Sequence, residues 1–131
     1  MTDHQIANII FNETRSLSGT DVQRARANIA HAIMNAERAP VRPRTAPSTA
    51  TVPKVERGIY AQCLDAVHIA TAERIKATDP TGGATNFNFR KNDVRTPFYG
   101  LKLRTQVGPL NNSHPSQDLP GNGIYANTYG Q

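Results

Sequence analysis

The helical periodicity of the apolar residues ends at Asp79, and this change constrains the fold more than any other feature of the chain. Before Asp79, apolar residues recur at intervals of three and four. After it, Gly, Pro and Asn are frequent and the apolar runs are short. The junction itself, Asp79-Pro80-Thr81-Gly82-Gly83, is typical of a turn. The sequence therefore predicts helices first, followed by short strands and loops.

Three helices are predicted in the first part of the chain. They cover about residues 3–16, 20–38 and 53–78. Thr2 and Gln5 stand three apart, which fits a capping box at the start of the first helix. Residues 39–53 are rich in Pro and Arg and are expected to form an extended loop.

The second part of the chain is expected to form a small antiparallel hairpin. Ala84 to Phe89 and Leu101 to Val107 have the alternation of strands. The remainder is expected to be loop, with fragments such as Ile124-Tyr125-Ala126. The 131 residues suit one domain, residues 1–131. The predicted fold class is α+β and mostly helical, with a short antiparallel β-hairpin and a loop-rich C-terminal part.

The composition limits the classes of molecule that the protein is expected to bind. A net charge of +5 favours anionic partners such as nucleic acid, anionic lipid or the acidic polymers of a bacterial wall. Nucleic acid is not expected, because no helix has a dense basic face with interleaved aromatics. Membrane insertion is not expected either, since no window approaches about 20 apolar residues. The single cysteine, Cys63, excludes an intramolecular disulfide, and the histidines lack metal-ligand spacing, so no metal or cofactor is expected.

Glu13 is an acidic residue on an apolar stripe. It follows Ile9 by four residues and Ile10 by three, so it projects from the apolar face of the first helix. Desolvation there raises the pKa of a carboxyl group, which suits a general acid. The structural alternative is an ion pair with Arg15 or Arg38. Glu13 is the candidate catalytic residue.

Three segments resemble the SleB-type cell wall hydrolases, in that family's order. They are Ile9-Ile10-Phe11-Asn12-Glu13-Thr14-Arg15, the segment Ala30 to Arg38 with Asn35, and Asp79-Pro80-Thr81-Gly82-Gly83-Ala84-Thr85-Asn86-Phe87. The resemblance covers roughly residues 5 to 90. It implies a small lysozyme-like fold, similar to lytic transglycosylases and goose-type lysozymes, with Glu13 as the catalytic acid. The family's usual closing strand, Gly-x-His-x-Phe-Tyr, is absent from this chain.

The resemblance implies cleavage of the peptidoglycan glycan strand between MurNAc and GlcNAc. Two mechanisms remain open. A muramidase needs a second carboxylate, for which the candidates are Asp21, Asp65, Asp79, Asp93 and Asp118. A lytic transglycosylase uses Glu13 alone, first as acid and then as base, while a hydroxyl or N-acetyl group of the substrate completes the reaction.

The expected substrate-binding residues surround the paired-glycine turn. They are Gly82, Gly83, Ala84, Thr85 and Asn86, together with Tyr125. Phe87 and Phe89 are alternate residues of a strand and are favoured as core. We expect Glu13 to lie half-buried at the floor of a sugar-sized groove beside the glycines.

A second function fits the same residues. The chain could be a non-catalytic component of a virion or secretion apparatus that binds the cell wall. The N-terminus lacks the basic and apolar regions of a secretory signal, although the substrate lies in the periplasm or cell wall. We therefore expect a phage-derived or delivered protein that is virion-associated, holin-released or injected, with phage tail or secretion components as partners.

Overall fold

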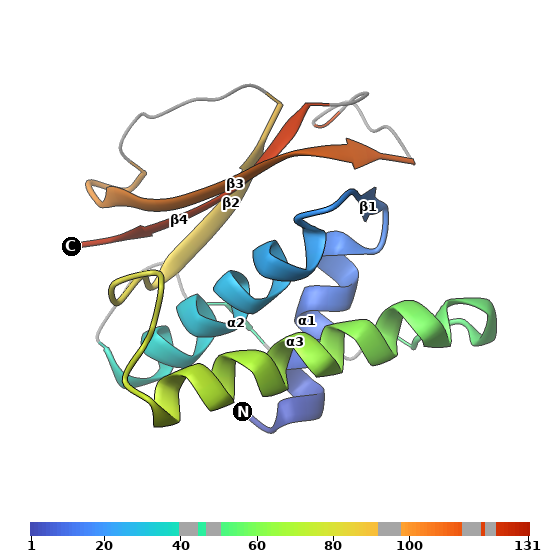
Figure 1. Ribbon diagram of the computed structural model, residues 1–131, viewed down its shortest axis with the longest axis horizontal. Helices are drawn as coiled ribbons and strands as arrows, with labels where there is room; N and C mark the ends of the chain where they lie inside the picture. The colour runs from blue at the N-terminus through green and yellow to red at the C-terminus, as the bar shows by residue number, and fades with distance from the viewer. Residues whose placement is uncertain (40–44, 47–50, 92–97, 114–118, 120–122) are drawn as a thin grey trace.

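The computed structural model describes residues 1–39, 45–46, 51–91, 98–113, 119 and 123–131. Within these residues lie three α-helices and one antiparallel sheet (Figure 1). The helices are α1 (Asp3–Thr14), α2 (Val22–Arg38) and α3 (Arg57–Ile75), the last preceded by the 3-10 helix η1 (Lys54–Glu56). The strands are β1 (Leu17–Ser18), β2 (Asn86–Arg90), β3 (Lys102–Asn112) and β4 (Ile124–Gly130).

The helices follow local sequence signals. The Thr2 hydroxyl accepts a hydrogen bond from the Gln5 backbone N–H, and the Gln5 side chain accepts one from the Thr2 N–H, which confirms the predicted capping box. The three predicted helices are present. The third begins at Arg57 rather than at Pro53, because the residues after Pro53 form η1.

The prediction of a mostly helical, lysozyme-like fold is wrong. The strands form a curled half-barrel sheet in the order β1-β3-β4-β2, so the protein is α+β with a substantial sheet. The predicted hairpin is also wrong, because β2 and β3 do not pair with each other. Both pair with β4, which lies between them and was expected to be mostly loop. Contacts between segments far apart in sequence determine this arrangement, and local patterns do not contain them.

Gly and Pro in the C-terminal part mark an irregularity inside a strand rather than a loop. The register of β3 against β4 shifts between Val107 and Leu110, where Gly108 and Pro109 lie. A Cβ atom on Gly108 would stand 2.7 Å from the Ile124 carbonyl oxygen, so the close approach of the two strands requires glycine there. Pro109 has no N–H, which suits it to a position where the ladder is interrupted.

Helix α2 lies between the sheet and the other two helices (Figure 1). One core cluster joins the three helices, and a second lies between α2 and the sheet. Phe87 and Phe89 of β2 pack against the helical cluster, as expected of core residues. Among the described residues, no helix has the length and apolar character needed to cross a membrane.

The predicted loop at residues 39–53 lies largely outside the described residues.

Candidate functional site

Glu13 lies in the last turn of α1, just before β1. It lies one turn beyond Ile9, on the side of α1 that carries Ile6 and Ile9. Its side chain is exposed, so the expectation that Glu13 lies half-buried at the floor of a groove is wrong. The surrounding protein still desolvates the carboxyl group enough to raise the pKa of Glu13. Within the described residues, the Glu13 side chain has neither a hydrogen bond nor an ion pair. Arg15, one of the expected partners, pairs with Glu56 instead.

The neighbouring Thr14 fixes this turn. Thr14 is fully buried, and its hydroxyl donates to the Ile10 carbonyl at 2.7 Å. The same oxygen accepts a hydrogen bond from Arg26 Nε at 2.9 Å. The end of α1 is therefore tied to α2, while Glu13 projects from it without a partner in the described part of the chain.

The second polar cluster is built on Asp79, at the start of the paired-glycine turn. Asp79 Oδ1 accepts hydrogen bonds from the Thr81 backbone N–H at 2.8 Å and from the Thr81 hydroxyl at 2.7 Å. Oδ2 accepts from Asn35 Nδ2 at 2.9 Å and from the Gly83 N–H at 3.2 Å. Burial alone would raise the pKa of Asp79, but the hydrogen bonds from Thr81 and Asn35 lower it overall. This carboxylate holds the turn in place and is not free to act as a catalytic base.

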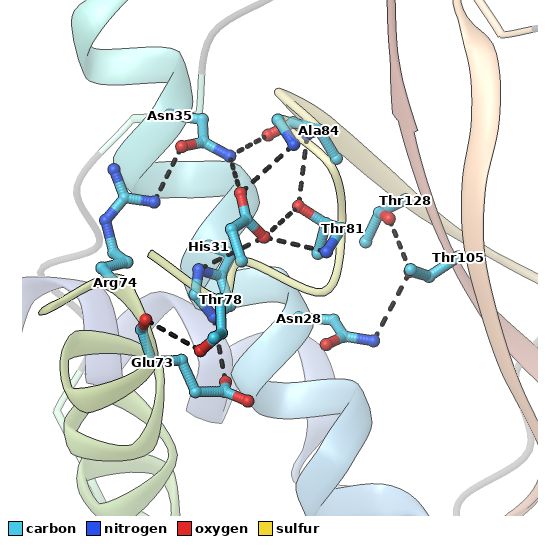
Figure 2. Close-up of polar contacts among 12 residues, drawn as sticks. Asn28, His31, Asn35, Glu73, Arg74, Thr78, Thr81, Ala84, Thr105 and Thr128 are labelled. Carbon is cyan, nitrogen blue, oxygen red and sulfur yellow. Dashed lines mark hydrogen bonds and ion pairs between the residues drawn. The ribbon is translucent and has the colours of Figure 1, made fainter. Parts of the chain in front are cut away.

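His31 connects this turn to α3. Its ring is fully buried, with Nδ1 3.4 Å from Asp79 Oδ1 and Nε2 3.0 Å from Glu73 Oε1. Glu73 also pairs with Arg24 through two hydrogen bonds of 2.7 and 2.9 Å. The hydrogen bond from Arg24 is the main reason that the pKa of Glu73 is lowered, against the opposing effect of burial. Figure 2 shows His31 between Glu73 and the turn that carries Thr81.

Asn35 closes the cluster. Its amide nitrogen donates to the Ala84 carbonyl at 2.8 Å as well as to Asp79, and its oxygen accepts from Arg74 at 2.7 Å (Figure 2). One side chain of α2 therefore joins α3 to both ends of the turn. The segment with Asn35 and the segment that begins at Asp79, two of the three that resemble the SleB-type hydrolases, meet here. Asn35 and Asp79 both contact the turn and hold it in place.

The predicted substrate-binding residues do not gather around Glu13. Gly82 and Gly83, with φ of 60° and 89°, provide the left-handed backbone of the turn and line a groove of about 910 Å³. Ala84 is buried, and the Thr85 hydroxyl donates to Asn86 Oδ1 at 2.9 Å. Tyr125 is half-buried on β4, on the face of the sheet that points away from the helices.

The groove lies away from the acid. Its walls include Ile6, Asn35, Arg74 and Asp79, and Glu13 is not among its lining residues. Thr14, next to Glu13, contacts Arg26, whereas the turn contacts Asn35, nine residues or about 13 Å further along α2. In Figure 1, the end of α1 beside β1 and the loop before β2 lie at opposite ends of α2. The structure thus does not bring Glu13 and the glycines into one groove.

The other candidates for a second catalytic carboxylate are either exposed or outside the described residues. Asp21 is the exposed N-cap residue of α2 and makes no capping hydrogen bond through its side chain, and Asp65 is exposed on α3. Asp93 and Asp118 lie outside the described residues. Cys63 is fully buried, and burial raises the pKa of its thiol, as expected of a core cysteine. The described residues contain no cluster of potential metal ligands.

Two buried residues were not singled out from the sequence as structural centres. His31 was expected to be a surface or satisfied histidine, but it is buried and only half satisfied: Nε2 contacts Glu73 Oε1 at 3.0 Å, whereas Nδ1, 3.4 Å from Asp79 Oδ1, has no hydrogen bond among the described residues. The second is Arg26, whose place four residues after Val22 and three before Ile29 puts a charge on the apolar stripe of α2. A charged residue on an apolar face is the one signal in the sequence that indicates such a centre.

Comparison with protein-family models, with curated proteins and with solved structures finds no match to this chain.

Proposed function

We propose that this protein cleaves the glycan strand of peptidoglycan, with Glu13 as the general acid. The observation that carries the proposal is the state of Glu13: a carboxyl group with a raised pKa, open to solvent and unpartnered within the described residues. A general acid must hold its proton near the working pH and reach the substrate. The resemblance of the Glu13 segment to the first helix of the SleB-type hydrolases supports the same role.

The chemistry follows from that one group. Glu13 protonates the oxygen of the MurNAc–GlcNAc bond as the bond to the anomeric carbon breaks. The resulting carboxylate then removes a proton from the nucleophile that attacks the same carbon. If the nucleophile is the C6 hydroxyl of the sugar, the product is a 1,6-anhydro sugar; if it is water, the product is a reducing end. Asp79 accepts four hydrogen bonds within and around the turn, which favours the transglycosylase mechanism because it needs no second carboxylate.

The second candidate function is binding of the cell wall without catalysis. One observation favours it: the 910 Å³ groove at the glycine turn does not include Glu13. In that case the protein serves as a wall-contacting component of a virion or secretion apparatus. It would retain peptidoglycan without releasing fragments from it.

Digestion of purified peptidoglycan, followed by mass spectrometry of the products, tests the proposal. We expect glycan fragments from the wild type and a loss of at least about 100-fold in Glu13→Gln, the usual range for a missing general acid. Asp65→Asn, which removes an exposed carboxylate on α3, is the matched control and should be fully active. Anhydromuramyl ends identify a transglycosylase, and reducing ends identify a hydrolase.

Three outcomes would overturn it. Full activity of a folded Glu13→Gln variant removes the acid role, and release of peptides alone indicates an amidase or peptidase. Binding to peptidoglycan sacculi with no released fragment establishes the second function instead.

A further inference from the structure

Arg26 is a buried cation on α2. Only 2% of the residue is exposed, and burial lowers the pKa of its guanidinium, which stays protonated at neutral pH. No carboxylate of the described residues lies within ion-pair distance of it. A buried charge is costly unless hydrogen bonds satisfy it. Its presence therefore needs an explanation other than general packing.

The guanidinium joins the three helices at one point. Nε donates to Thr14 of α1 at 2.9 Å, and one terminal nitrogen lies 3.2 Å from the side-chain oxygens of both Gln23 and Gln62. Gln62 belongs to α3, and Gln23 lies one turn before Arg26 on α2. Of these three hydrogen bonds of Arg26, only the one to Thr14 reaches α1, the helix that carries Glu13.

A cation such as Arg26 stabilises the C-terminal end of α1. The last turn of α1 contains no basic residue, although the carbonyl end of a helix carries partial negative charge. Thr14 is adjacent to Glu13, so whatever fixes the Thr14 side chain also fixes the backbone from which Glu13 projects. The catalytic carboxyl group itself has no partner that could hold it among the described residues.

We propose that Arg26 is a positioning residue which, through Thr14, holds the last turn of α1 so that Glu13 reaches the glycosidic oxygen. This inference rests on the proposed function of Glu13. A displacement of about 1 Å can lower a catalytic rate by about 100-fold. Loss of the contact should therefore act on kcat, while KM, which reflects contacts along the whole glycan, changes little.

A double-mutant cycle tests the coupling, with kinetics on soluble glycan-strand fragments. Arg26→Met removes the cation at similar volume, and Thr14→Val removes its acceptor on α1 together with the hydrogen bond from the Thr14 hydroxyl to the Ile10 carbonyl. We expect each to lower kcat by about 10-fold or more with KM within about 2-fold of wild type. The double variant should be no slower than Arg26→Met, because both changes break the same contact. Gln23→Ala removes one bond of the same guanidinium and the bond from Gln23 Nε2 to the Gln62 carbonyl of α3, but no contact with α1, and should keep the wild-type kcat.

Circular dichroism establishes that each variant is folded. If Arg26→Met does not fold, Thr14→Val carries the test through its kcat and KM alone. A folded Arg26→Met or Thr14→Val with wild-type kcat overturns the inference, as does full additivity in the double variant. Glu13→Gln separates the two proposals. If it is active, the proposed function fails; if it is inactive while Arg26→Met retains kcat, only the role of Arg26 fails.

Discussion

Asn35 binds Asp79 through a hydrogen bond of 2.9 Å from Nδ2 to Oδ2. The bond joins α2 to a turn that begins 44 residues later in the chain. Because the same amide also contacts Ala84 and Arg74, three contacts depend on one side chain.

Replacement of Asn35 by Ala should therefore destabilise the protein strongly. It leaves the Asp79 carboxylate and the Ala84 carbonyl each short of a donor, and such groups cost about 1–3 kcal/mol each when buried. We expect the free energy of unfolding to fall by about 2–4 kcal/mol in urea titrations. Asn111→Ala, an exposed position on β3, should change it by less than about 0.5 kcal/mol. Equal effects of the two changes would contradict the role of Asn35.

Acid should weaken the same turn. Hydrogen bonds lower the pKa of Glu73 and of Asp79 below the ordinary values of 4.5 and 3.8. Carboxylates with lowered folded-state pKa values stabilise the protein above their unfolded pKa values, and that stability disappears as pH falls through the folded ones. Urea titrations at about pH 6 and about pH 3 should therefore give a lower free energy of unfolding at the more acidic pH.

The Asp79→Asn variant provides the control for this pH dependence. It should be less stable than the wild type at pH 6, because an amide cannot accept all four of the hydrogen bonds to Asp79. Its stability should also fall less steeply with acid. A wild-type profile that is flat down to pH 3 would show that the two carboxylates do not stabilise the fold.

Two glycines should respond in opposite ways to alanine. At Gly108, with φ of 151°, a Cβ would lie 2.7 Å from the Ile124 carbonyl, so Gly108→Ala should cost more than about 2 kcal/mol. At Gly58, in the first turn of α3, a Cβ meets nothing within 4 Å, so Gly58→Ala should stabilise by up to about 1 kcal/mol. Thermal unfolding of the two variants measures both. A stable Gly108→Ala protein would contradict the close approach of β3 and β4.

Glu13→Gln should be slightly more stable than the wild type at neutral pH. Desolvation raises the pKa of Glu13, so its charged form is less favourable in the folded than in the unfolded protein. Because the group is exposed, we expect a gain of only a few tenths of a kcal/mol, which vanishes once the pH falls below the ordinary value of 4.5. Urea titrations at two pH values measure it, with Asp65→Asn as the neutral control. A loss of stability would reveal a contact of the Glu13 carboxylate.

The helices were predictable because their signals are local. The capping box of Thr2 and Gln5 and the apolar stripes of all three helices lie within windows of a few turns. The sheet was not predictable in this way. Asn127 is buried on β4 because Gln106 donates to it from β3 and it donates to Asn88 on β2, contacts between residues 21 and 39 positions apart. A polar residue in such a strand has the sequence appearance of a loop.

In the candidate site, too, the features set by local sequence were predictable and those set by long-range packing were not. The position of Glu13 on an apolar stripe followed from helical spacing, and the absence of a partner among the described residues did not. The turn at Asp79 was recognised as a turn, but its attachment to His31 and Asn35 depends on the packing of α2 against it. The expectation that both belong to one groove assumed a lysozyme-like fold, which the sheet contradicts.

The central position of β4 has a consequence for synthesis on the ribosome. Strands β2 and β3 are translated before β4, yet among the described residues β2 has no partner strand, and β3 has only the two-residue β1, until residues 124–130 emerge. A nascent chain that ends earlier exposes the edges of β2 and β3 that pair with β4 in the complete sheet, and their free backbone groups favour association with other chains. Helices α1 to α3 can form during translation, whereas completion of the sheet must wait for the last strand.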